Sequence, residues 1–220
     1  MTDLPIVICF GDSNTYGAIG PTGLRHPRDV RWPGVVDSIL AGRAFVVEEG
    51  LNGRVTIWED PFAPGRNGRT YLLPCLASHA PVAVLVIMLG TNDLKAIHRL
   101  GPAEIAAGAG SLVDLALASG AGPDGGPPAV LLVAPPPLGT LTIASELWGF
   151  GAGRETSARL ARFYQEAAAQ SGVAFLDAGA LVAPDPSDGV HLDAAAHAIL
   201  GRAIAEAVGD LLARPSPAAG

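Results

Sequence analysis

Four short polar segments stand out in an otherwise apolar and glycine-rich sequence, and together they hold the residue types that acyl transfer requires. They are Gly11-Asp12-Ser13-Asn14, Glu48–Arg54, Gly90–Asp93 and Asp188–His191. A serine hydroxyl attacks a carbonyl carbon efficiently only when a base accepts its proton. His191 can be that base, and the carboxylate of Asp188, three residues earlier, can orient the ring through Nδ1. We therefore predict a nucleophile at Ser13, a base at His191 and an orienting carboxylate at Asp188.

The same segments offer hydrogen-bond donors for the negative oxygen of a tetrahedral intermediate. The candidates are the backbone N–H groups of Ser13 and Gly53 and the side-chain amide of Asn92. Asn92 could instead cap the helix that follows it, a position that asparagine often takes. Gly53 could be only a turn glycine, although both roles are compatible because glycine lets a backbone N–H approach a ligand closely. We predict an oxyanion hole formed by Ser13, Gly53 and Asn92.

Metal and phosphate sites are the alternatives for these polar residues. A metal site around His191 would use Asp188, Asp193 and His197. His197, however, lies further along an alanine-rich stretch and fits a partly buried helix histidine better, so we expect no metal. The glycines after the first apolar run have neither the dinucleotide spacing of three glycines nor a P-loop Lys-Ser/Thr pair. The Gly-x-Ser-x-Gly elbow of the larger α/β-hydrolase fold is also absent at Ser13.

The polar segments follow apolar runs that have the character of buried strands. Five runs are β-rich and continuously apolar: Ile6–Phe10, Ala44–Val47, Val82–Leu89, Val130–Ala134 and Val173–Leu176. Continuous rather than alternating hydrophobicity is typical of strands that are buried on both faces of a parallel sheet. Helical periodicity is found in three stretches: Pro102–Ser119, Gly153–Ser171 and Asp193–Leu212, the last with Asp193 as a plausible N-cap. The connections, such as Gly17–Pro27 and Pro135–Gly153, are rich in Gly and Pro.

Alternating strands and helices predict the α/β class. The expected architecture is a three-layer α/β/α sandwich around a five-stranded, mostly parallel sheet of the doubly wound, flavodoxin-like kind. Such sheets bind ligands beyond the carboxyl ends of their strands, which is where the polar segments fall. No composition shift or repeat divides the sequence, so we predict a single domain over residues 1–214 and a frayed tail over residues 215–220.

Composition and charge exclude several classes of protein. Of the 220 residues, 49% are hydrophobic and 16% are charged, which is enough apolar sequence to bury a sizeable core. The net charge of -7 argues against a nucleic-acid or anionic-membrane partner, because both require a basic surface. One lysine stands among thirteen arginines, which we attribute to genome bias.

The two cysteines and the apolar stretches bear on the cellular compartment. Cys9 and Cys75 are too few for a disulfide scaffold and are expected to be free thiols. No signal-peptide pattern is visible, and the longest apolar stretch, Ala80 to Leu89, is too short to span a bilayer. We therefore expect a cytoplasmic protein.

The four polar segments, taken in order, resemble the four blocks of the SGNH hydrolase (GDSL esterase/lipase) family. These blocks carry Ser in the first, Gly in the second, Asn in the third and His in the fourth. The first block ends here in Asn14 where the family name has Leu, a position outside the chemistry. A closer similarity to the aryl-esterase/acyltransferase (perhydrolase) branch extends from about Ile6 to Leu212 and is carried by Glu48–Arg54, Met88–Asp93, Ala134–Leu138 and Asp188–Leu192.

This resemblance implies an activity and a role for each site residue. Ser13, His191 and Asp188 would be nucleophile, base and orienting carboxylate, with Ser13, Gly53 and Asn92 as the oxyanion hole. The implied enzyme is a serine esterase for short-chain esters (aryl esters, acetylated alcohols or sugars) that forms an acyl-enzyme on Ser13 and needs no metal or organic cofactor. The branch adds acyltransferase or perhydrolase activity, and a homo-oligomer is left open. The alternative from another class is a non-catalytic carbohydrate- or ligand-binding module on the same scaffold.

Overall fold

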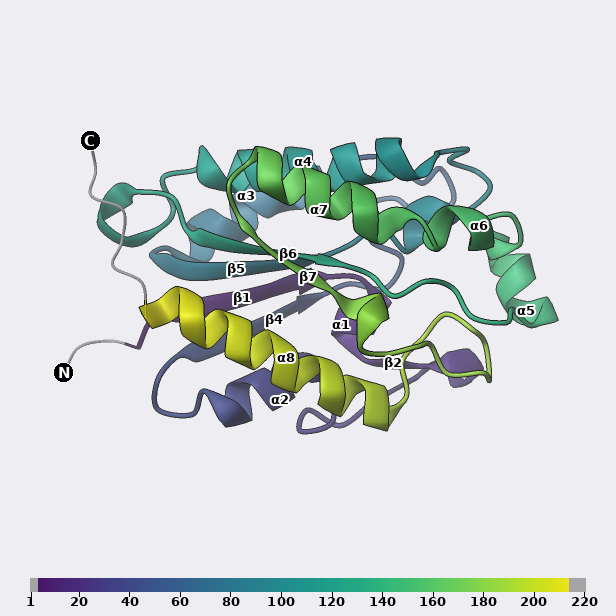
Figure 1. Cartoon of the computed structure of the whole chain (residues 1–220), viewed down its shortest axis with the longest axis horizontal. Helices are drawn as coiled ribbons and strands as arrows, with labels where there is room; N and C mark the ends of the chain where they lie inside the picture. Colours follow the sequence, from purple (N-terminus) through teal and green to yellow (C-terminus); the bar gives the residue numbers. More distant parts are fainter. Residues whose placement is uncertain (1–3, 214–220) are drawn as a thin grey trace.

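The computed structural model describes residues 4–213, and a five-stranded parallel sheet forms its centre (Figure 1). The strands are β1 (Ile6–Gly11), β4 (Phe45–Gly50), β5 (Val82–Met88), β6 (Ala129–Ala134) and β7 (Ala174–Asp177). They lie in the order β4-β1-β5-β6-β7, and every neighbouring pair is parallel. From β1 the chain adds β4 on one side and β5, β6 and β7 on the other, as in a doubly wound sheet. The predicted fold class is confirmed.

Helices cover both faces of the sheet, which explains why its strands are continuously apolar. On one face lie α2 (Trp32–Ile39) and α8 (Ala194–Ala213); on the other lie α3 (Gly68–His79), α4 (Pro102–Leu117) and α7 (Leu160–Gln170) (Figure 1). Along β1, Val7 and Cys9 belong to the core under α2 and α8, whereas Ile8 and Phe10 belong to the opposite core. All four side chains are fully buried, so neither face of the strand tolerates a polar residue.

The predicted start of α8 is confirmed, whereas the helix predicted before it is divided in two. Asp193 caps α8 as predicted, since its Oδ1 accepts a hydrogen bond from the N–H of Ala196 at 2.7 Å. The single helix predicted over Gly153–Ser171 is wrong, because the stretch forms α6 (Arg154–Ser157) and α7 separately. The Ser157 hydroxyl accepts a hydrogen bond from the backbone N–H of Leu138 at 3.0 Å. This bond ties α6 to the segment after β6, while α7 packs on the sheet.

Short elements, several of them at the carboxyl edge of the sheet, occupy stretches that the sequence marks as connections. They are α1 (Ser13–Tyr16), β2 (Ala18–Ile19), η1 (Gly20–Thr22), β3 (Leu24–Arg25), η2 (Asn92–Leu94), η3 (Pro123–Gly125), α5 (Ile143–Ser145), η4 (Glu146–Phe150) and η5 (Ala178–Ala180). β2 and β3 pair as a small antiparallel hairpin. The hairpin and α5 lie toward the same end of the molecule (Figure 1).

Among the helices of residues 4–213, none has both the length and the apolar composition to cross a membrane. The tail predicted for residues 215–220 lies outside the described residues. Cys9 and Cys75 are both buried and both free thiols. The single domain over residues 1–214 stays a prediction.

His197 is fully buried, not partly buried as the sequence suggested. It lies on α8, and its Nδ1 accepts a hydrogen bond from the backbone N–H of Trp32, the first residue of α2, at 3.3 Å. The His26 ring packs edge-on against it, with 5.1 Å between ring centroids. Burial, helped by the charges of His26, His191 and Arg31, lowers the pKa of His197 to about 3. A neutral imidazole therefore joins the two helices on this face.

We predict that His197 makes the protein less stable in mild acid. Its pKa is about 6.5 in an unfolded chain and about 3 in the folded protein, so acidification protonates the unfolded state first and favours it. The stability contribution is complete above pH about 6.5 and falls as the pH decreases toward about 3. Denaturant unfolding at pH 7 and pH 5 should show a smaller loss of stability in His197→Gln than in the wild type. An equal loss in both proteins contradicts this prediction.

Candidate active site

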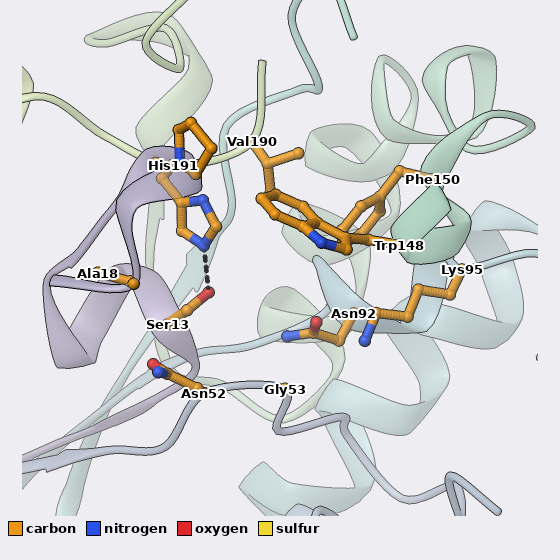
Figure 2. Close-up of a pocket in the computed structure, with 13 residues that line it drawn as sticks. Ser13, Ala18, Asn52, Gly53, Asn92, Lys95, Trp148, Phe150, Val190 and His191 are labelled. Carbon is orange, nitrogen blue, oxygen red and sulfur yellow. Dashed lines mark hydrogen bonds between the residues drawn. The ribbon is translucent and has the colours of Figure 1, made fainter. Parts of the chain in front are cut away.

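Ser13 lies where β1 ends and α1 begins. Asp12 caps this short helix, because its Oδ1 accepts a hydrogen bond from the N–H of Asn14 at 2.9 Å. The Ser13 side chain is thereby fixed at the carboxyl edge of the sheet, and only 7% of the residue is exposed. Its Oγ lies 3.1 Å from Nε2 of His191, a residue 178 positions later in the chain (Figure 2).

Asp188 completes a chain of hydrogen bonds that begins at Ser13. Its Oδ2 lies 2.6 Å from Nδ1 of His191, and its Oδ1 accepts the backbone N–H groups of Val190 at 2.8 Å and His191 at 2.9 Å. Burial alone would raise the pKa of Asp188, but these hydrogen bonds outweigh it and lower the pKa below its ordinary value. The carboxylate is therefore ionised and holds the ring with Nε2 free to face Ser13.

Asn14, expected to lie outside the chemistry, holds the segment that carries His191. Its Nδ2 donates to the carbonyl of Val190 at 3.2 Å, and its Oδ1 accepts the N–H of Leu192 at 3.0 Å. Both neighbours of His191 are thus tied to the residue beside Ser13. Sequence reasoning missed this role, and the only signal was the departure of Asn14 from the leucine in the family name.

The predicted oxyanion donors lie on two neighbouring loops. Asn92 donates one amide hydrogen from Nδ2 to the carbonyl of Arg54 at 3.1 Å, which leaves its second hydrogen available, and its amide nitrogen is turned toward Ser13 (Figure 2). Gly53 is the third residue of a tight turn closed by the N–H of Arg54 on the carbonyl of Leu51 at 3.0 Å. Its φ of 79° is the left-handed conformation that such a turn requires of glycine.

The backbone N–H groups of Ser13 and Gly53 have no hydrogen-bond acceptor among residues 4–213. Buried or half-buried N–H groups are nearly always paired in proteins, so two free ones beside a nucleophile indicate a place for a ligand oxygen. Together with Asn92 they make three donors of the kind that can stabilise an oxyanion. The structure therefore brings Ser13, Gly53, Asn92 and His191 together at one cavity, and Asp188 contacts His191 from outside it.

Arg54 joins the strand ends that carry these loops. Its buried guanidinium donates to the carbonyl of Gly11 at 3.0 Å and to that of Glu49, which lie at the ends of β1 and β4. The same group lies over the Phe10 ring, 4.2 Å from its centroid. Burial lowers the pKa of Arg54, although the charge of Glu49 opposes the shift. Because the carbonyl of this residue also accepts the Asn92 amide, Arg54 links the ends of β1, β4 and β5.

The cavity in front of Ser13 has a volume of about 290 Å³. It is lined by Ser13, Ala18, Gly20, Pro21, Gly23, Asn52, Gly53, Asn92, Lys95, Trp148, Phe150, Val190 and His191. Trp148, on η4, packs edge-on against the His191 ring with 5.9 Å between ring centroids. This volume fits a small ester.

The alternative metal site is not assembled in the described part of the chain. His191 contacts Asp188 and Ser13, whereas the Nδ1 of His197 is used by Trp32. A different group, Glu49, Cys75 and His79, places three potential ligand atoms within 4.8 Å of one another. Burial, reinforced by the charge of Glu49, raises the pKa of the Cys75 thiol to about 12, and Nδ1 of His79 lies 2.9 Å from the Cys75 carbonyl. The Cys75 thiol is therefore protonated, and only Nε2 of His79 is left to face a ligand.

Comparison with known proteins places this geometry among esterases. The model of the GDSL-like lipase/acylhydrolase family matches residues 9–199. The aryl esterase of M. smegmatis is 40% identical over 94% of this chain and 99% of its own, with a TM-score of 0.89. A carbohydrate acetylesterase from Sinorhizobium meliloti is 41% identical, with the same coverage of both chains and a TM-score of 0.89. No curated protein matches the chain.

We predict that Asn14→Ala lowers both stability and turnover. The variant loses two hydrogen bonds to the His191 segment, which should cost about 1–3 kcal/mol of unfolding free energy. The looser segment should lower kcat by about 10-fold, because a nucleophile and base that are held less precisely react more slowly. Thr22→Ala, at an exposed hydrogen bond of η1, is the control and should change kcat less than twofold. Wild-type kcat in Asn14→Ala contradicts the positioning role.

Proposed function

Because this chain belongs to the GDSL-like lipase/acylhydrolase family and is a carboxylic-ester hydrolase, we propose that it cleaves short-chain esters through an acyl-enzyme on Ser13. The substrates are aryl esters and acetylated alcohols or sugars; its structural relatives are an aryl esterase and a carbohydrate acetylesterase. One observation carries the assignment of residues: an unbroken series of hydrogen bonds runs from Asp188 through His191 to Ser13. This is the arrangement that activates a serine hydroxyl.

Acylation begins when Ser13 Oγ forms a bond to the carbonyl carbon of the ester. His191 Nε2, 3.1 Å away, takes the hydroxyl proton, and the ionised Asp188 stabilises the resulting imidazolium. The electron pair of the C=O bond moves onto oxygen, which accepts hydrogen bonds from the N–H groups of Ser13 and Gly53 and from Nδ2 of Asn92. These donors are fixed before the reaction, so little reorganisation is needed as the charge develops.

The intermediate collapses by re-forming the C=O bond and breaking the bond to the alcohol oxygen. His191 gives its proton to that oxygen, the alcohol departs, and the acyl group remains on Ser13. Water then repeats the sequence: His191 takes a proton from it, the hydroxide attacks the acyl carbon, and collapse releases the acid. The proton returns to Ser13 Oγ, and the free enzyme is restored.

Acyl transfer is a second outcome that we propose for the same intermediate. Trp148, Phe150 and Val190 give the cavity an apolar wall, which favours an organic alcohol over water as acceptor. An alcohol that takes the place of water yields a new ester, and hydrogen peroxide yields a peracid. The ratio of new ester to free acid, measured at increasing alcohol concentration, tests this outcome.

The cellular context that we propose is the cytoplasm. The thiols of Cys9 and Cys75 are both free and buried, as is usual for proteins that fold in a reducing compartment. The partner is a small-molecule ester, without nucleic acid or membrane, in agreement with the net charge of -7.

We predict that a fluorophosphonate labels Ser13 covalently and abolishes ester hydrolysis. Only an activated serine displaces the fluoride, so mass spectrometry should find the phosphonyl group on the peptide that contains Ser13. Ser13→Ala should lose the label and lower kcat by at least about 10⁴-fold. Ser171→Ala, whose hydroxyl lies at an exposed hydrogen bond, should keep both label and activity. An unlabelled wild type that hydrolyses no ester would favour the non-catalytic binding module.

We predict that Asn92→Ala lowers kcat by about 10²–10³-fold while KM changes little. The hydrogen bond from Asn92 strengthens as the carbonyl oxygen becomes negative, so its loss affects the transition state more than the bound substrate. Asn92→Asp should be at least as damaging, because it places a carboxylate against the oxyanion. An active Asn92→Asp enzyme contradicts the oxyanion role; the alternative of a helix cap is already wrong, because Thr91 takes the cap position of η2 and no side chain caps it.

A further inference from the structure

Lys95 is the only lysine of the chain, and it lines the cavity. It follows directly after η2, with its N–H bonded to the carbonyl of Asn92 at 3.2 Å. In Figure 2 its side chain lies on the far side of Asn92 from His191. Only 19% of the side chain is exposed. A flexible ammonium with three donors therefore faces the substrate cavity beyond the oxyanion hole.

The ammonium group of Lys95 is incompletely paired. The nearest carboxylate, that of Asp60, is 4.0 Å from Nζ, at the outer limit of an ion pair. The other oxygen of Asp60, Oδ1, already accepts the backbone N–H of Phe62 at 2.9 Å. The Phe150 ring provides a second, weaker contact, with Nζ 5.8 Å from its centroid. Most of the hydrogen-bonding capacity of Nζ is thus open to a ligand.

Arg66 brings a second positive charge close to Gly53, one of the residues that line this cavity. A Cβ on Gly53 would lie 3.6 Å from Nε of Arg66, so the guanidinium stands beside the oxyanion loop. Arg66 makes no ion pair with any residue of the 4–213 range. Burial lowers the pKa of Lys95, the charges of Asp60, Asp12 and Asp93 raise it, and that of Arg66 lowers it, so the two cations repel each other. An anion bound at Lys95 would offset this repulsion.

We propose that Lys95 and Arg66 form an anion subsite that binds a carboxylate carried by the acyl part of the ester. The assignment to the acyl part follows from the mechanism: His191 protonates the departing alcohol, so the alcohol lies on the His191 side. Lys95 lies beyond Asn92, on the other side (Figure 2). The substrate class is therefore the half-esters of short dicarboxylic acids. This inference rests on the proposed function, because it needs an acyl group bound at Ser13.

The test compares kcat/KM for charged and neutral esters that differ little in shape. Monoethyl esters of succinate and glutarate are measured beside neutral near-isosteres in which an isopropyl group replaces the carboxylate, with released ethanol followed by NMR. We expect the wild type to prefer the half-esters, and Lys95→Met to lower this preference by about 10-fold or more, the effect of one charge-assisted hydrogen bond. Arg66→Met should lower it in the same direction.

Arg162→Met is the matched control, because Arg162 is an exposed cation on α7, where it pairs with Glu166. It should keep the wild-type preference. Because Lys95→Met leaves Asp60 unpaired, Lys95→Met/Asp60→Asn is measured as well and should show the same loss. A preference restored in the double variant means that Asp60 repulsion, rather than a missing cation, caused the loss, and overturns the subsite.

Two further outcomes separate this inference from the proposed function. Acetoxyacetate, measured beside isobutyl acetate, carries its carboxylate on the alcohol; a Lys95-dependent preference for this ester alone overturns the acyl-side assignment. Equal rates for half-esters and isosteres in the wild type overturn the anion subsite but leave the esterase intact. An enzyme that cleaves none of the esters and takes no fluorophosphonate label contradicts the proposed function itself.

Discussion

The ionised state of the buried Asp188 carboxylate is the constraint on which the site depends. A buried carboxylate stays charged only when hydrogen bonds replace its water, and two of the three donors here belong to the backbone of the next residues. The segment must therefore curl around the carboxylate. The N–H groups of Asp188 and Gly189 close onto the carbonyl of Asp185, and the N–H of Asp185 bonds to the carbonyl of His191. The position of the imidazole follows from backbone geometry rather than from a flexible side chain.

The oxyanion side depends on a second buried charge, the guanidinium of Arg54. In a parallel sheet the carboxyl ends of neighbouring strands lie side by side, but each loop beyond them needs its own attachment. Arg54 supplies it by bonding the ends of β1 and β4 with its side chain and the η2 residue Asn92 with its carbonyl. Asn14 does the same between α1 and the His191 segment. Arg54 and Asn14 thus connect the loops that follow neighbouring strands into a single site.

The sequence predicted the elements that have a clear hydrophobic pattern, and it did not predict those that form because of tertiary contacts. The buried strands were evident because both faces are apolar, and the site residues because each follows a strand or precedes the last helix. Helix α3 gave no usable periodicity and contains Pro74, so it was not predicted. The β2–β3 hairpin has strands of two residues each, too short for a pattern. Lys95, attributed to genome bias, became informative only when the fold placed it in the cavity.

Two more buried carboxylates, Asp12 and Asp93, position the site residues but are unfavourable to bury in their charged form. Burial raises the pKa of each to about 6, even though hydrogen bonds oppose the shift. Asp12 caps the helix of Ser13, and Asp93, beside Asn92, accepts the backbone N–H and the hydroxyl of Thr56. Above pH about 6 both carboxylates are charged near the proposed oxyanion hole, which lowers the stability of the fold relative to two uncharged groups. Asp12 holds Ser13 in place and Asp93 holds Asn92. The loss of stability caused by burying these carboxylates is therefore offset by a site that needs no rearrangement during the reaction.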